Sequence, residues 1–189
     1  MRRTFEVNVF GPMAMVQGFA PLLVKTATPE RPTVIVNIGS TASLPPPFMA
    51  TYGASKAAIQ GLSGALRLEM YSLNVRVMTL ELGVVRTAMS AGEKLGDIMR
   101  SPTSGYYDNF DEIFKQVEAT MADLLTSAPT AAAVASQIAD AVKASPPPKL
   151  WLGEMSAAFR FIVPLLPVRL LDHLWWKPQG VDKVKAPIR

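Results

Sequence analysis

The chain has 189 residues, no cysteine and one histidine, His173, so disulfides, thiolate metal sites and histidine-rich metal clusters are excluded. Its residues are 49% hydrophobic and 18% charged, a composition typical of a folded domain and not of a disordered chain. The net charge of +4 is small for a nucleic-acid-binding protein, and no arginine-rich helix accompanies it. We therefore expect one domain that binds no nucleic acid.

Strands and helices are predicted to alternate along the chain. Residues 4–24 carry apolar side chains at helical spacing and predict a helix, whereas the β-branched run TVIVNIG at 33–39 predicts a buried strand. The same criteria predict a helix at 51–71, a strand at 75–82, an alanine-rich helix at 130–143 and a short strand at 149–153. This alternation indicates the α/β class with a parallel sheet.

Residues 83–127 give a mixed pattern with several aromatic side chains in or near a helical stretch. We expect these aromatic residues to pack in the interior or to line a substrate wall: Tyr106, Tyr107, Phe110 and Phe114. The apolar, aromatic character of this region suggests an apolar small-molecule substrate.

The C-terminal residues 154–189 are expected to form an amphipathic lid or tail on the core formed by residues 1–153. Segment 157–177 has nearly the length of a membrane span, but two prolines and the charged residues Arg160 and Arg169 interrupt it. We therefore expect peripheral contact with an intracellular membrane, and the alternative is a terminal helix packed on the body. Because the N-terminus does not resemble a signal peptide, a cytoplasmic location is expected.

Tyr52 and Lys56 are the first candidates for catalysis. They lie four residues apart in TYGASKAAIQ, so a helix places both side chains on one face. A free tyrosine titrates near pH ~10, and a neighbouring ammonium favours the phenolate and lowers that value. Such a pair could exchange a proton with a carbonyl or an alcohol. The alternative is a solvent-exposed tyrosine beside a solvent-exposed lysine.

Ser40 and Asn8 are two further candidates. Ser40 follows the strand at 33–39, at the end where open α/β sheets bind their ligands, and its hydroxyl could hold a substrate oxygen. Pro12 lies four residues after Asn8 and has no N–H, so it should kink the helix and leave the Asn8 carbonyl free for a water that leads toward Lys56. The alternatives are a turn residue for Ser40 and an ordinary helical residue for Asn8.

Four short stretches, in the order VNVFG, VIVNIGS, YGASK and LGVVRT, resemble the second half of a short-chain dehydrogenase/reductase. The resemblance covers nearly the whole chain, and the tail LLPVRLLDHLWWKPQGVDKV is similar to that of fungal members of the acyl-dihydroxyacetone-phosphate reductase type. It implies a partial Rossmann-like, doubly wound parallel sheet of about three strands with flanking helices. It also implies an NADPH-dependent oxidoreductase that reduces a carbonyl of a lipid-like or secondary-metabolite substrate.

The resemblance also implies roles for individual residues. The catalytic residues would be Ser40, Tyr52, Lys56 and Asn8, and those that contact NADP(H) would be Tyr52, Lys56, Val85 and Thr87. For Thr87 a helix N-cap is the alternative. Homo- or hetero-oligomers would form through the helices at 4–24 and 51–71.

The sequence departs from the family pattern in its cofactor motif. No G-x-x-x-G-x-G or G-x-G-x-x-G occurs, and the chain begins with the helix expected after the fourth strand of the family fold. We therefore expect the second half of the fold, with an apolar edge at strand 33–39 and with most affinity for the dinucleotide lost. Leu82 also replaces the expected proline before Gly83, and the Ser40–Tyr52 interval is one residue shorter than is usual in the family.

Two other functions follow from the same residues. A cofactor-independent acid/base enzyme, such as a dehydratase, isomerase or cyclase, would reuse Tyr52 and Lys56 without a nucleotide. A non-catalytic partner subunit would use the helices at 4–24 and 51–71 to assemble with a full-length relative.

Overall fold

The computed structural model describes residues 1–44, 47–87 and 111–179. Three parallel strands form one sheet in the order β1 (Thr33–Ile38), β2 (Val75–Leu82) and β3 (Lys149–Leu152). The predicted α/β class, the parallel sheet and all three predicted strands are therefore confirmed.

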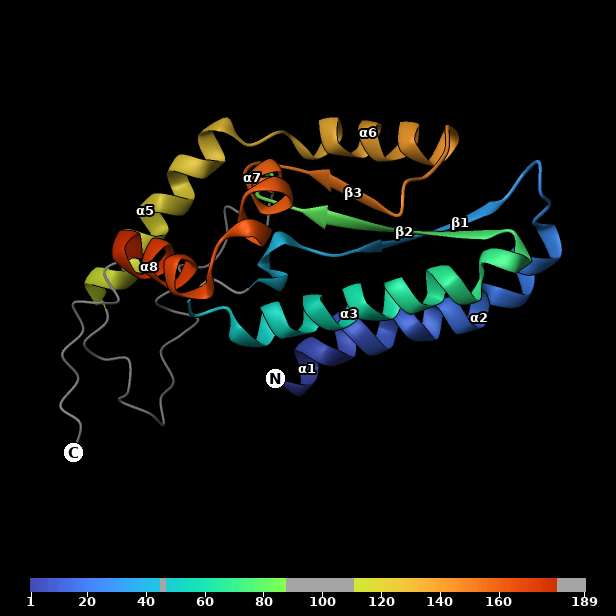
Figure 1. The fold of residues 1–189 in the computed structure, drawn as a ribbon, viewed down its shortest axis with the longest axis horizontal. Helices are drawn as coiled ribbons and strands as arrows, with labels where there is room; N and C mark the ends of the chain where they lie inside the picture. Colours follow the sequence, from blue (N-terminus) through green and yellow to red (C-terminus); the bar gives the residue numbers. More distant parts are fainter. Residues whose placement is uncertain (45–46, 88–110, 180–189) are drawn as a thin grey trace.

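Helices cover both faces of this sheet (Figure 1). On one face lie α2 (Gly11–Thr26) and α3 (Ala50–Glu69), and on the other lies α6 (Ala131–Lys143), whose N-cap is Thr130. A short helix α1 (Arg2–Phe5) and a π-helical turn (Glu6–Phe10) precede α2, so the helix predicted at 4–24 is present with an irregular first part.

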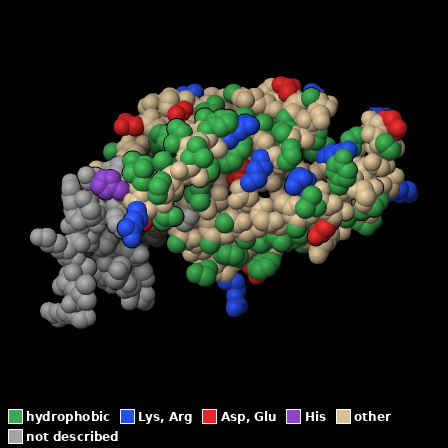
Figure 2. Space-filling model, viewed as in Figure 1, with side chains coloured by type: hydrophobic (Ala, Val, Ile, Leu, Met, Phe, Trp, Pro, Cys, Tyr) green, Lys and Arg blue, Asp and Glu red, His purple; other side chains and the backbone are tan. Residues whose placement is uncertain are grey.

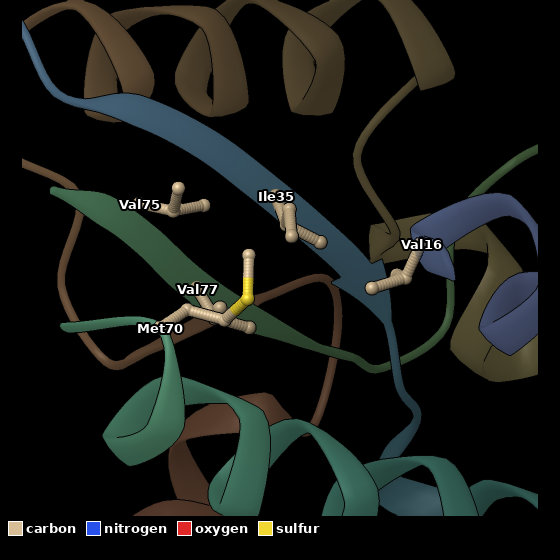
Figure 3. Packing of buried hydrophobic residues seen from close by; sticks show 5 residues of the cluster. All are labelled: Val16, Ile35, Met70, Val75 and Val77. Atoms are coloured by element: carbon tan, nitrogen blue, oxygen red, sulfur yellow. The ribbon is translucent and has the colours of Figure 1, made fainter. Parts of the chain in front are cut away.

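Apolar side chains of the sheet pack toward each helical layer. Toward α2 and α3 the buried cluster consists of Val16, Ile35, Met70, Val75 and Val77, which are shown in Figure 3. Toward α6 the buried cluster consists of Leu80, Val134 and Leu152. The alternation along β2 thus sends odd-numbered side chains to α3 and even-numbered ones to α6, as the period of a strand requires.

Three further helices lie beyond the carboxyl ends of the strands: α5 (Asp111–Ser127), α7 (Ser156–Phe161) and α8 (Val168–Gln179). Phe114 of α5 is buried and meets the Phe48 ring edge-on, with ring centroids 5.4 Å apart. The other aromatic residues expected in this region, Tyr106, Tyr107 and Phe110, lie outside the described residues. The tail is helical in two pieces, with an intervening turn at Val163–Leu165.

The open edge of the sheet is β1, which pairs only with β2 among the described strands. Its last residue, Ile38, is 54% exposed. Beside it, the helical stretch Arg2–Thr26 has a mean hydropathy of 1.5 and passes a length-and-composition test for a membrane span, with 11% of its apolar window buried. A helix from the core of a soluble protein passes the same test, so this finding alone assigns no span.

Candidate active site

Helix α3 places Tyr52 and Lys56 on the same face, one turn apart, near its N-terminus. The Lys56 Nζ lies 5.7 Å from the centroid of the Tyr52 ring. Tyr52 is half-buried in the first turn, where the helix dipole favours a negative charge such as a phenolate. The Lys56 ammonium therefore lies over the Tyr52 ring.

The Lys56 ammonium is held by the end of strand β1. Its Nζ donates a hydrogen bond to the Ile38 carbonyl oxygen at 2.8 Å, which ties α3 to the carboxyl edge of the sheet. Burial lowers the pKa of Lys56 from its usual value, and the negative charge of Glu81 partly opposes this shift. An ammonium has three protons, so two remain for other partners.

Ser40 lies directly beyond β1 and is buried. Its Oγ donates to the Leu82 carbonyl oxygen at 3.2 Å and accepts from the Ala42 N–H at 3.1 Å, which caps the short 3-10 helix Thr41–Ser43. In the described part of the chain, neither bond goes to Tyr52. The hydroxyl has a single proton, which goes to Leu82 here, so a hydrogen bond from Ser40 to a substrate oxygen requires the hydroxyl to turn away from that carbonyl.

Asn8 lies in the π-helical turn Glu6–Phe10, four residues before Pro12. Proline has no N–H to donate to the preceding turn of a helix, and an irregular turn is one way to compensate for the missing hydrogen bond. Turns of the π type are frequent at functional sites. The Asn8 Nδ2 donates to the Ser55 Oγ at 3.0 Å, and the Ser55 hydroxyl donates to the Tyr52 carbonyl oxygen at 2.7 Å. The structure thus links Asn8 to the first turn of α3 through its side chain.

The two residues expected at the nicotinamide end lie beyond β2. Val85 is half-buried and packs against the cluster on the α6 side of the sheet. Thr87 is exposed and is the last residue described before 88–110. The backbone between them is fixed by the Arg86 N–H, which donates to the Pro129 carbonyl oxygen at 3.0 Å.

A groove of about 470 Å³ runs between the α2 stretch, the β1 edge and α3. Its polar lining comes from Asn8, Asn37 and Lys56, whereas most of its other lining residues are apolar. Asn8 and Lys56 therefore face a common space, but Ser40 and Tyr52 do not line it.

Sequence reasoning missed three polar residues of this region: Ser55, Gln60 and Glu81. Ser55 is fully buried in YGASK and connects Asn8 with Tyr52. Glu81 is fully buried in β2, and the Gln60 Nε2 donates to its Oε1 at 2.6 Å. A carboxylate within the otherwise mostly apolar run VRVMTLEL was the available signal, because a buried charge requires partners.

Glycine is required where β2 leaves the sheet. A Cβ added to Gly83 would overlap the Glu154 carbonyl oxygen, which no side chain tolerates. The next residue, Val84, exchanges two backbone hydrogen bonds with Glu154. This close approach positions the segment that carries Val85 and Thr87.

Comparison with known proteins identifies relatives along nearly the whole chain. A family model described as short chain dehydrogenase matches residues 1–96. Short-chain dehydrogenase fogD of Aspergillus ruber is 33% identical over 186 residues, which cover 98% of this chain and 62% of that protein. An NADPH-dependent 3-dehydrocapnine reductase of Ornithobacterium rhinotracheale is 26% identical over 179 residues, which cover 94% of this chain and 62% of that protein.

A solved structure has the same fold. The crystal structure of a short-chain dehydrogenase from Streptomyces avermitilis matches with a TM-score of 0.62 and 22% sequence identity, covering 97% of this chain and 63% of that one. The chain therefore spans less than two thirds of the length of each of these relatives.

Proposed function

Because the chain belongs to the short-chain dehydrogenase family, we propose that it carries the proton-transfer site of an NADPH-dependent carbonyl reductase. In this mechanism Tyr52 gives the proton of its hydroxyl to the carbonyl oxygen of the substrate, and the Ser40 hydroxyl turns from the Leu82 carbonyl to donate to that oxygen. The Lys56 ammonium stabilises the phenolate that remains. NADPH, when bound, supplies the hydride for the carbonyl carbon.

The observation that carries this proposal is the position of the Lys56 ammonium. It is fixed by the Ile38 carbonyl oxygen and lies beside the Tyr52 ring. An exposed amphipathic pair on a helix surface would make no such bond to the sheet. Asn8, which is linked to the carbonyl of Tyr52 through Ser55, supports the same reading because it connects a fourth expected residue to this turn.

The residues present fit one end of the cofactor. Lys56 retains two ammonium protons that could reach a ribose, and Thr87 lies beyond the carboxyl end of β2, where α/β sheets bind ligands. For the pyrophosphate end of the cofactor no binding motif is found in this sequence, which contains no glycine-rich turn. The NADPH-dependent relative supports NADP(H) as the dinucleotide, and the missing motif predicts that this chain alone binds it weakly.

We propose the substrate class from the apolar residues of the C-terminal tail. The exposed apolar residues of the tail, among them Phe161, Ile162 and Leu165, support a lipid-like or secondary-metabolite carbonyl compound and a tail that contacts a membrane peripherally. A lid over the site is compatible with the position of α7 and α8 beyond the carboxyl ends of the strands.

A fluorescence titration of NADPH into the purified chain, followed by turnover assays with apolar ketones and aldehydes, tests the proposal. We expect weak binding that saturates, with slow carbonyl-dependent oxidation of NADPH. Tyr52→Phe should bind NADPH equally well but lose turnover, whereas Tyr71→Phe, a change at an exposed tyrosine, should behave like the wild type. Absence of both binding and turnover in the wild type would reject the proposal for these 189 residues.

The open edge of β1 favours a second candidate function, that of a partner subunit. Unpaired backbone groups of an edge strand bind an added strand readily, and the groove beside β1 is largely apolar. Apolar side chains lie along the lower edge of the molecule in Figure 2. The helical stretch Arg2–Thr26 also has exposed apolar residues, which include Phe10, Met15, Phe19 and Leu22. Self-association or binding to a full-length relative, measured by light scattering, would support this role, and a monomer indifferent to such a relative would contradict it.

A further inference from the structure

The carboxylate of Glu81 is the one charged side chain with no exposure among the described residues of the sheet. It points from β2 toward α3, where its Oε1 accepts a hydrogen bond from the Gln60 Nε2 at 2.6 Å. The Lys149 Nζ of β3 lies 3.9 Å from the same oxygen and is about half exposed, so this ion pair is long and partly solvated. A buried charge with so little compensation is costly for stability. Its presence in β2 therefore points to a role in the site.

The other oxygen of this carboxylate faces the residues that position the site. Glu81 Oε2 is buried and has no hydrogen-bond partner among the described residues. A Cβ added to Gly39 would lie 3.0 Å from it, so the absence of a side chain at Gly39 makes room for the oxygen. Gly39 lies between Ile38, whose carbonyl holds Lys56, and Ser40.

We infer that Glu81 is a positioning residue of the site: its buried carboxylate, held by Gln60 beside Gly39, places a negative charge behind the strand end that holds Lys56 and Ser40. The role in catalysis rests on the proposed function, whereas the effect on Lys56 does not. Among the elements packed around the carboxylate, α3 contributes Lys56 and Gln60, β3 contributes Lys149, and the adjoining end of β1 contributes no charged residue.

The electrostatic relation between the two groups is reciprocal. Burial alone lowers the pKa of Lys56, and the negative charge of Glu81 raises it again. Burial raises the pKa of Glu81, while the Gln60 hydrogen bond and the charges of Lys149 and Lys56 lower it. Removal of the Glu81 charge should therefore make the Lys56 ammonium lose its proton at a lower pH, and the phenolate of Tyr52 would then lose its counter-charge.

The test is the titration of Lys56 itself, measured by competitive amine labelling at a series of pH values with quantification of the Lys56 peptide by mass spectrometry. In Glu81→Gln, which preserves the shape of the side chain and an acceptor for Gln60, the Lys56 midpoint should fall by roughly half a pH unit or more. The matched control is Glu69→Gln, which removes an exposed charge at the far end of the same helix and should leave the midpoint unchanged.

A second variant keeps the test valid if Glu81→Gln folds poorly. Glu81→Met replaces the carboxylate by an apolar side chain of similar length, a change that buried positions often tolerate, and it should lower the Lys56 midpoint in the same direction. An unchanged midpoint in a folded Glu81→Gln protein, or equal shifts in it and in Glu69→Gln, would overturn the inference. Because labelling requires no turnover, a shifted midpoint in a protein without NADPH-dependent activity would reject the proposed function and still support the effect of Glu81 on Lys56.

Discussion

Lys56 of helix α3 and Ile38 of strand β1 are joined by a hydrogen bond of 2.8 Å from the ammonium to the backbone carbonyl. The bond fixes a side chain that would otherwise sample many rotamers, and it leaves the ammonium beside the Tyr52 ring. Because the acceptor belongs to the backbone, substitution of Ile38 would not remove it. The position of the charge therefore depends on the packing of α3 against the end of β1.

Substitution of Lys56 by methionine removes the positive charge and keeps most of the length of the side chain. Lys56→Met should lower carbonyl reduction by about 100-fold or more, because the phenolate of Tyr52 loses its counter-charge. Burial lowers the pKa of Lys56 below 10.5, so wild-type activity should decline on the alkaline side at a pH below that value. Steady-state rates across this pH range measure both effects.

The control for this prediction is Lys115→Met, which removes an exposed lysine of α5 that pairs with Glu112. It should leave both the rate and the pH profile unchanged. Equal activity of Lys56→Met and the wild type would show that the ammonium takes no part in proton transfer.

Ser40 is predicted to contribute to both stability and turnover. Ser40→Ala removes the hydrogen bond to the Leu82 carbonyl and the cap on the Ala42 N–H, which should cost about 1–3 kcal/mol in the free energy of unfolding. It should also lower turnover per folded molecule, because the substrate oxygen loses a donor. Urea unfolding and kinetics on the same preparations give the two quantities.

A matched side-chain-to-backbone bond distinguishes these two contributions. Thr28 accepts from the Arg31 N–H in the turn before β1, at the opposite end of that strand from Ser40, so Thr28→Ala should cost about 1 kcal/mol and leave turnover unchanged. If Ser40→Ala also kept full turnover per folded molecule, Ser40 would be a turn residue and nothing more.

The apolar surface of α2 is predicted to mediate association. Phe19 is half exposed and lines the groove beside β1, so Phe19→Gln should weaken self-association and shift the scattering mass toward the monomer. Met121→Gln changes a less exposed apolar residue of α5 and should have no such effect. A wild-type chain that is monomeric over the whole concentration range would contradict the prediction.

Local sequence patterns were sufficient to predict the main elements of the fold. The β-branched run of β1 and the apolar spacing of α3 depend on near neighbours, and the four-residue interval between Tyr52 and Lys56 alone places both on one face. The proline at position 12 indicated an irregular helix near Asn8, and the structure has a π-helical turn there.

The partners of the buried polar groups could not be predicted in the same way. In the sequence, Ser55 is one of several small residues of α3. Only the folded chain brings Asn8, in the turn Glu6–Phe10 (η1), against it. In the sequence, Glu81 is a charged residue within a mostly apolar strand. Its partner Gln60 and its neighbour Gly39 lie beside it only in the folded chain, where α3 and β1 pack on β2. Such contacts depend on tertiary structure, which no local period encodes.

The buried carboxylate should also be visible in the pH dependence of stability. Burial raises the pKa of Glu81 above its ordinary value of 4.5, so the unfolded chain loses this proton before the folded chain does. The free energy of unfolding should therefore fall as pH rises from 4.5 through the raised pKa. Lys56 contributes a slope of the opposite sign, between its lowered pKa and 10.5, because there the unfolded chain holds the proton longer.

Urea unfolding of the wild type and of Glu81→Gln at a series of acidic and neutral pH values measures this contribution. The variant lacks the titrating group, so its stability relative to the wild type should improve as pH rises from 4.5 toward neutrality. Glu69→Gln, whose carboxylate is exposed, should follow the wild-type profile at every pH. If the stability difference between Glu81→Gln and the wild type did not change with pH, the Glu81 carboxylate would have the same proton affinity in the folded and unfolded chains, and burial in β2 would not perturb it.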